Sequence, residues 1–229
     1  MAAFSKSFGK SVARTVALGA WLAGLSAGVV APAAVAEENT RGRELFELCQ
    51  QCHGANAGGN PLTLAPSIAG LQQWYVERQL TGFKAGYRGQ EFHDIAGMRM
   101  RPMARWLKTD DDVKAVAAYV SSLPPVRPAP TLAGGDAAKG QAFYAPCTAC
   151  HGPDGSGNQL LNAPALNHAS DWYLLTQLRN FKAGIRGTNA GDSFGKIMQP
   201  MSMTLPDEQA MKDVIAYITT LSAKTASAQ

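Results

Sequence analysis

The sequence predicts an all-α protein built from two similar helical domains in tandem. Sliding the chain along itself by 98 positions aligns 42–123 with 140–221 without a gap, and 31 of the 82 aligned pairs are identical. Several segments carry apolar residues at helical spacing, and none shows the sustained alternation of a strand. A repeat of this length indicates a duplicated domain, because the units of a solenoid are shorter.

Each half contains stretches that predict helices in the same order. Four of them are 44–48, 73–83, 141–144 and 171–181. The second and fourth end at Ala-Gly, a common C-terminal signal. Thr109 precedes three aspartates (110–112), so we expect these charges to stabilise a helix start rather than to form a docking patch. Leu205-Pro-Asp-Glu opens the equivalent helix, with the proline early in it.

Composition and the repeat divide the chain into five parts. We expect a cleaved signal peptide at 1–36, a first domain at 37–123, a linker at 124–135, a second domain at 136–223 and a tail at 224–229. The linker is rich in Pro and Gly and cannot continue a helix.

The N-terminus has the pattern of a secretory signal peptide. Lys6, Lys10 and Arg14 precede an apolar run over 16–30, and Ala34-Val-Ala36 is a small-residue cleavage site. We expect cleavage after Ala36 rather than an uncleaved anchor, because the apolar run is short and interrupted by glycines. The predicted location is the periplasm of a Gram-negative cell, if the source is bacterial.

The charge of the chain is nearly balanced. The sequence has 21 basic and 17 acidic residues, and removing the three basic residues of the signal leaves 18 against 17, or +1. Nothing in this balance indicates binding of nucleic acid.

All four cysteines lie in two copies of one pentad. These are Cys49-Gln-Gln-Cys52-His53 and Cys147-Thr-Ala-Cys150-His151. C-x-x-C-H is the attachment motif of c-type haem, in which the two thiols bond to the vinyl groups and the histidine coordinates the iron. The sequence therefore predicts two covalently bound haem c groups, with His53 and His151 as axial ligands.

Two other uses of these cysteines are less consistent with the pattern. A four-thiolate zinc site would need the pairs at a shorter spacing, and the histidine after each pair would be a coincidence. A thioredoxin-like redox pair would not normally occur twice in register.

The second axial ligand is expected to be a methionine. Neither His93 nor His168 has a histidine at the equivalent position of the other half. We therefore do not expect histidine to be the second axial ligand in both halves. The motif Met-x-Pro-Met does recur, as Met100, Met103, Met198 and Met201. Methionine is also a common core filler, but its recurrence around a proline, in a stretch that we expect to be irregular, favours a thioether directed at iron. The spacing leaves both members of each pair open.

These features resemble class I cytochrome c. Each half has a pentad near its start, a proline shortly after it, a methionine downstream and a final Ala-Tyr helix. Two such domains in one exported chain resemble the dihaem cytochrome c4 family, most specifically over 75–86 and 173–184. The resemblance covers nearly all of the predicted mature chain. It implies that the first methionine of each pair, Met100 and Met198, is the iron ligand.

The resemblance also suggests roles around each haem. It implies that the carbonyls of Pro66 and Pro164 accept the free N–H of the axial histidines. Six further repeat-matched residues can be placed near the haem edges or propionates, or in ordinary core and loop positions: Trp74, Tyr75, Arg88, Trp172, Tyr173 and Arg186.

His/Met ligation fills both axial sites, so we expect a one-electron carrier and not an enzyme. The predicted role is to carry electrons in a respiratory chain, from a quinol-oxidising complex or dehydrogenase to a terminal oxidase or reductase. Peripheral contact with membrane complexes is compatible with this role. The alternative is an electron-transfer haem subunit of a multi-subunit dehydrogenase or oxidase complex.

A dihaem enzyme is a less favoured interpretation. A peroxidase would need a five-coordinate haem, and the thiosulfate-oxidising type would need a further cysteine. The two haems are expected to differ in potential, because Arg99 and Arg101 flank Met100 whereas Ile197 and Gln199 flank Met198. Positive charge disfavours Fe(III), so the first domain should have the higher potential.

Overall fold

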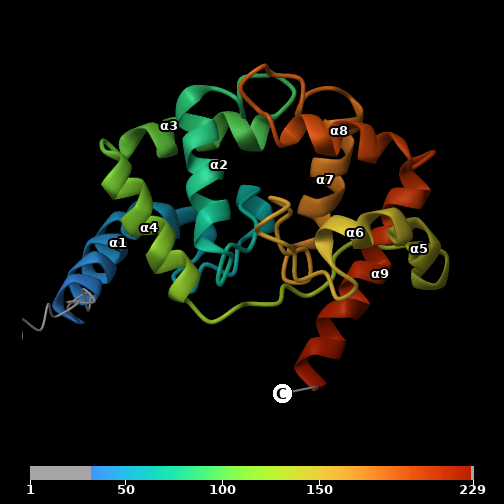
Figure 1. Ribbon diagram of the computed structural model, residues 1–229, viewed down its shortest axis with the longest axis horizontal. Coiled ribbons are helices and arrows are strands. Elements are labelled where there is room, and N and C mark those ends of the chain that lie inside the picture. The colour runs from blue at the N-terminus through green and yellow to red at the C-terminus, as the bar shows by residue number, and fades with distance from the viewer. Residues whose placement is uncertain (1–31, 228–229) are drawn as a thin grey trace, which may run out of the picture. The chain divides into compact units, whose positions relative to one another are not determined.

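The computed structural model describes residues 32–227, with side chains over 39–221. The first half contains α1 (Pro32–His53), α2 (Gln73–Ala85), α3 (Ile95–Trp106) and α4 (Asp110–Ser122) (Figure 1). The second contains α5 (Ala137–Tyr144), α6 (Thr148–His151), α7 (Asp171–Lys182), α8 (Gly195–Met203) and α9 (Glu208–Ser227). Short 3-10 turns occur at Pro61–Thr63 and Ala145–Cys147. No strand occurs in 32–227, where the chain forms only isolated bridges, so the all-α prediction is confirmed.

The predicted signal peptide lies almost entirely outside the described residues. Only its last residues, 32–36, fall at the beginning of α1, so this helix starts before the predicted cleavage point. None of the described helices is both long and apolar enough to cross a bilayer.

The first and last helices of each half pack at a glycine. Gly42 on α1 lies against the backbone of Ala115 on α4, and Gly140 on α5 lies against the backbone of Asp213 on α9. A Cβ atom at either glycine would overlap a backbone carbonyl oxygen of the facing helix. The two crossings are therefore built in the same way, as the duplication predicts.

The predicted caps are present at several helix ends. Gly86 ends α2 in the left-handed conformation, with φ 84°, where glycine avoids the steric penalty of a side chain. Thr109 caps α4, and its hydroxyl accepts the Asp112 N–H while the Asp112 carboxylate accepts the Thr109 N–H. The aspartates thus serve the helix start, as predicted. Pro206 precedes α9 rather than lying early in it.

The helix before the haem motif differs between the halves. In the first half α1 runs without interruption through the whole pentad to His53. In the second half α5 ends at Tyr144, and a 3-10 turn containing Pro146 separates it from α6. Proline lacks the N–H that would continue the α-helical bonding, and the equivalent residue of the first half is Leu48.

The expectation that the methionine stretches are irregular is wrong. They form α3 and α8, with Pro102 and Pro200 inside the helices. Proline removes one backbone hydrogen bond, but its fixed φ suits a helix, so a short helix can continue past it. The overlooked signal is a repeat-matched aspartate before each helix, since the carboxylate of Asp94 accepts the Gly97 N–H and that of Asp192 accepts the Gly195 N–H.

The linker lacks helix, as predicted, but it is held on both halves. The Ser67 hydroxyl donates to the carbonyl of Val126 in the first half. In the second half the buried Asp171 carboxylate accepts the N–H groups of Thr131 and Leu132 and the Thr131 hydroxyl. The linker is therefore an anchored part of the fold.

Candidate haem sites

The first pentad opens into an apolar cavity between the helices of the first half. The cavity has a volume of about 170 Å³, and its lining includes Cys49, Cys52 and His53 from α1. Met100 and Met103 line the same cavity from α3. The structure thus brings the predicted covalent ligands, the axial histidine and both candidate methionines to one space.

The second pentad opens into an equivalent but larger cavity. Its volume is about 510 Å³, within the range of small-molecule and cofactor sites. Cys147 and His151 line it near the pentad, and Met198 and Met201 line it from α8. Cys150 is exposed and is not part of the lining.

Each predicted axial histidine is held by a proline carbonyl. The distance from His53 Nδ1 to the Pro66 oxygen is 2.9 Å, and that from His151 Nδ1 to the Pro164 oxygen is 2.8 Å. Donation from Nδ1–H leaves the Nε2 lone pair free for a metal. Burial lowers the pKa of both histidines and outweighs the opposing effect of these hydrogen bonds, so both imidazoles are neutral near neutral pH. The predicted contacts with Pro66 and Pro164 are confirmed.

The four cysteines are not paired with one another, which leaves their thiols available for bonds to haem. None of the four forms a disulfide in the structure. Burial raises the pKa of Cys49 to about 11, and burial also raises the pKa of Cys147. The described residues contain no cluster of three or more His, Cys, Asp or Glu side chains that could hold a metal ion, so these cysteines do not assemble a four-thiolate site.

Two arginines, the buried Arg88 and the half-buried Arg186, meet across the boundary between the halves. Gln79 Oε1 accepts from Arg88 Nη1 at 2.6 Å and from Arg186 Nη2 at 3.0 Å. Gln177 Oε1 accepts from Arg186 Nη1 at 2.7 Å and from Arg88 Nη2 at 3.1 Å. Each glutamine therefore receives one hydrogen bond from its own half and one from the other. We call these four residues the Arg–Gln cluster.

The Arg–Gln cluster has unmet hydrogen-bonding capacity beside the cavities. The Nε atoms of Arg88 and Arg186 are buried and have no partner. Burial lowers the pKa of Arg186, and the adjacent positive charge of Arg88 lowers it further. Both arginines line the larger cavity, and Arg88 also lines the smaller one. Buried cations of this kind are stabilised by anions, which fits haem, because its propionates are carboxylates.

The remaining predicted residues divide between the cavities and the rest of the fold. Trp74, Tyr75 and Tyr173 line the larger cavity, whereas Trp172 lines neither. The expectation that His93 and His168 have no common ligand role is consistent with their positions. His93 is exposed, His168 is half-buried, and neither lines a cavity.

Sequence reasoning missed the two glutamines of the Arg–Gln cluster. Gln79 and Gln177 occupy equivalent positions of the repeat, in the sequence Gln-Leu that follows Tyr75 and Tyr173. Their identity in both halves was the available signal. Their role depends on contacts between the halves. Aligning one half with the other shows which positions are equivalent but not which residues touch.

A family comparison matches both halves separately. The cytochrome c family matches residues 40–124 and again 137–222. Among curated proteins, cytochrome c4 of Azotobacter vinelandii is 30% identical over 204 residues, covering 84% of this chain and 91% of the relative. Cytochrome c4 of Stutzerimonas stutzeri is 32% identical over 184 residues, covering 74% and 83%. The thiosulfate dehydrogenase electron acceptor of Thiomonas intermedia is 34% identical over 171 residues, covering 70% and 73%.

Solved structures give the same architecture. Reduced cytochrome c4 from Pseudomonas stutzeri matches with a TM-score of 0.62 and 27% identity, covering 79% of this chain and 96% of that one. The thiosulfate dehydrogenase TsdBA from Marichromatium purpuratum matches with a TM-score of 0.64 and 30% identity. The match covers 80% of this chain but only 40% of that longer chain.

The family match, the paired C-x-x-C-H motifs and the two cavities with their proline-held histidines agree. Each half holds one covalently bound haem c, and the relatives that match over most of their length are named cytochrome c4. The chain belongs to the cytochrome c family, as a dihaem electron-transfer protein of the cytochrome c4 type.

Proposed function

We propose that this protein carries single electrons in the periplasm between the complexes of a respiratory chain, with both haem irons ligated by histidine and methionine. The observation that carries the proposal is the convergence, in each cavity, of a proline-held histidine and a helix-borne methionine. Haem c, when bound, supplies a one-electron couple between Fe(II) and Fe(III). The protein's own residues hold the axial positions and exclude water.

Met100 and Met198 are the proposed sixth ligands. They occupy equivalent positions of α3 and α8 and are half-buried where they line the cavities. Met103 is 39% exposed, and its counterpart Met201 is half-buried. A thioether ligand favours Fe(II) and raises the potential, which suits a carrier that accepts electrons from quinol oxidation.

The Arg–Gln cluster is proposed to hold propionates at the boundary between the halves. Both of its arginines carry a buried Nε–H donor without a partner, and their other guanidinium nitrogens donate to glutamine oxygens. Carboxylates would complete their hydrogen bonding and balance their charge. This arrangement would also keep positive charge beside both irons.

We propose that the protein is not itself an enzyme, since methionine at both sixth positions leaves no site for substrate. Its predicted signal peptide, cleaved after Ala36, supports the periplasmic location. The relatives named as thiosulfate dehydrogenase electron acceptors suggest a dehydrogenase as one donor class. A quinol-oxidising complex is the other donor class, and a terminal oxidase or reductase is the acceptor.

Replacing each methionine tests the ligand assignment. Met100→Ala and Met198→Ala should each open one iron to cyanide and lower one of the two potentials by on the order of 0.1 V or more, within the range of ~0.8 V that axial ligands span. Redox titration with absorption spectroscopy resolves the two haems. Met103→Ala and Met201→Ala are the matched controls and should leave both potentials nearly unchanged. The assignment is wrong if the controls, rather than the first pair, show the loss.

A haem subunit of a larger complex is the second candidate function. Relatives named as cbb3-type oxidase subunit CcoP, and the longer TsdBA chain, favour it. Size-exclusion chromatography of the protein purified from its native source separates the two. A free shuttle elutes at the mass of one or two chains, whereas a subunit elutes with a stable stoichiometric partner.

A further inference from the structure

The outer side of α3 carries a line of apolar residues. Helical spacing places Ile95, Met98, Pro102 and Trp106 one above another on the helix, and we call this line the α3 stripe. Ile95 is 57% exposed, Met98 39% and Trp106 44%. None of the four lines the haem cavity, so the haem does not cover them.

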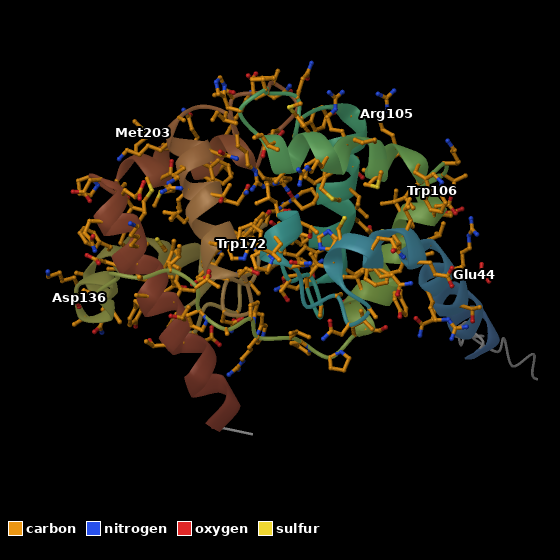
Figure 2. All side chains as sticks on the ribbon, turned by 180° about the vertical axis from the view of Figure 1, so that it is seen from behind. Glu44, Arg105, Trp106, Asp136, Trp172 and Met203 are labelled. Atoms are coloured by element: carbon orange, nitrogen blue, oxygen red, sulfur yellow. The ribbon has the colours of Figure 1, made fainter. Side chains whose placement is uncertain are left out.

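Arginines flank the α3 stripe. Arg99 lies on one side, where it also lines the haem cavity, and Arg105 lies on the other; both are exposed, and the half-buried Arg101 lies beside Arg105. None of the three forms an ion pair with any residue over 39–221, and Arg99 donates only to the carbonyl of Thr63. Figure 2 shows Arg105 extending outward from the end of the helix that also carries Trp106. The surface is an apolar centre with a rim of uncompensated positive charge.

The equivalent surface of α8 has the opposite pattern. Ser193, Lys196 and Thr204 stand where α3 has Ile95, Met98 and Trp106. Ile197 and Met203, 56% and 55% exposed, replace Arg99 and Arg105. An apolar centre with a basic rim therefore belongs to α3 and has no counterpart on α8.

The inner side of α3 faces the first haem cavity. Met100 and Met103, on that side, line the cavity. A protein seated on the outer side would be separated from the site by one helix, whose diameter is about 10 Å. The α3 stripe is therefore placed where electrons can pass to or from the first half.

We propose that the α3 stripe and its arginines form a docking surface for a redox protein whose own contact surface is an apolar patch bordered by carboxylates. This inference rests on the proposed electron-carrier function. Trp, Met and Arg are enriched at protein interfaces, whereas Lys is depleted, and α3 contains the first three and no lysine. Complementary charge speeds encounter and fixes orientation.

The charge component is tested with flavodoxin hydroquinone, an acidic protein that donates single electrons, as the probe. Reduction of the holoprotein is followed by stopped flow over a range of salt concentrations. Arg105→Met, which inserts the residue of α8 and lies outside the haem-cavity lining, should slow reduction about fourfold at low salt and flatten the salt dependence. The matched control, Arg43→Met, removes the same charge from an exposed position away from α3 and should change the rate by less than about twofold.

The apolar component is tested in the same assay. Ile95→Ser with Trp106→Thr should slow reduction by about fivefold or more and keep the salt dependence. Ile197→Ser with Met203→Thr removes two apolar residues of similar exposure from α8 and should have no effect. Ile95→Ser alone serves if the double variant attaches haem poorly, and the absorption spectrum reports this.

Three results would overturn the proposal. In the first, both α3 variants are reduced at the wild-type rate. In the second, the wild type binds vesicles of phosphatidylcholine with phosphatidylglycerol, and the α3 variants lose that binding while keeping their rates. In the third, ultracentrifugation shows a wild-type dimer that the α3 variants abolish. Failure of the carrier function itself would look different, because the wild type would then be reduced by dithionite but would exchange electrons with no protein.

Discussion

Around the haem the two halves repeat each other closely, whereas on the outer sides of α3 and α8 they have diverged. His53 and His151 contact their prolines at 2.9 and 2.8 Å. The helix crossings at Gly42 and Gly140 have the same geometry. The α3 stripe is apolar and its flanks are basic, whereas the equivalent positions of α8 are polar along the centre and apolar on the flanks. The two copies therefore agree in the histidine contacts and the helix crossings, and they differ on the outer sides of α3 and α8.

Substitutions at the two helix crossings should cause the largest losses of stability. They test whether the interiors of the two halves are equivalent. Gly42→Val and Gly140→Val each force a side chain into the facing backbone, so each should destabilise its half by about 3 kcal/mol or more. Chemical denaturation of the holoprotein measures the loss. Gly82→Ala is the control, since its added Cβ would lie 3.7 Å from the nearest atom, in ordinary contact with Arg88. A large effect in only one half would break the equivalence.

The contact between Asp171 and the linker has no equivalent in the first half. Its loss should destabilise the protein less than a substitution at a helix crossing. Asp171→Ala leaves the N–H groups of Thr131 and Leu132 without their acceptor, at a cost of about 1–3 kcal/mol. The equivalent residue is Gln73, which bonds only to Glu77 on its own helix, so Gln73→Ala should have little effect. Thermal unfolding and proteolysis of the linker measure both variants. Equal behaviour of the two variants would show that the linker is held by other contacts.

Acid should lower the stability of the first half by weakening the ion pair between Arg41 and Asp112, which the second half lacks. The hydrogen bond from Arg41, with smaller contributions from backbone N–H groups, lowers the pKa of Asp112, and the equivalent position is Ala210. The stabilisation is present above the ordinary carboxyl pKa and is lost as the pH falls through the lowered pKa. Asp112→Asn should therefore destabilise by about 1 kcal/mol at neutral pH, partly through its capping role, and by nearly nothing in acid.

Asp111→Asn is the matched control for that pH series. Asp111 is 91% exposed and forms only an exposed ion pair with Lys114, so Asp111→Asn should destabilise the protein less than Asp112→Asn does at neutral pH. Denaturation at several pH values distinguishes the two aspartates. Parallel curves for wild type and Asp112→Asn would contradict the prediction.

The break before the second pentad should have the smallest effect. Pro146→Leu introduces the residue of the first half and restores one backbone N–H, and it should change stability by less than about 1 kcal/mol. Far-ultraviolet circular dichroism and amide exchange report whether α5 then continues into the pentad. Ala145→Glu, which introduces the residue of the first half one position earlier, is the control. An unchanged exchange pattern in both variants would mean that packing, rather than the proline, ends α5.

Most of the local structure could be predicted from the sequence, because its signals are short-range. The pentads, the cap at Thr109 and the C-cap glycine at Gly86 act within a few residues. The helical state of the methionine stretches could not be predicted from Pro102 and Pro200 alone. In these short helices the stabilisation from capping and packing outweighs the destabilisation caused by an internal proline. The identity of the sixth ligands stays a prediction.

Contacts between the halves were beyond the reach of sequence reasoning. The repeat aligns Gln79 with Gln177 but does not show that each accepts a hydrogen bond from the other half. Arg88 and Arg186 were recognised as repeat-matched, with an exposed loop as the alternative. Arg88 is in fact 7% exposed, because the other half covers it.

The crossed hydrogen bonds of the Arg–Gln cluster also bear on how the protein could evolve. Separating the halves would leave Gln79 and Gln177 each short of one donor and would open a buried guanidinium to solvent. Both copies of the repeat carry the same pair of residues, and each pair exchanges one hydrogen bond in each direction with the other. Deleting either copy would therefore leave the remaining arginine and glutamine each with at least one hydrogen bond fewer, so a single half would not be an intact small version of this protein.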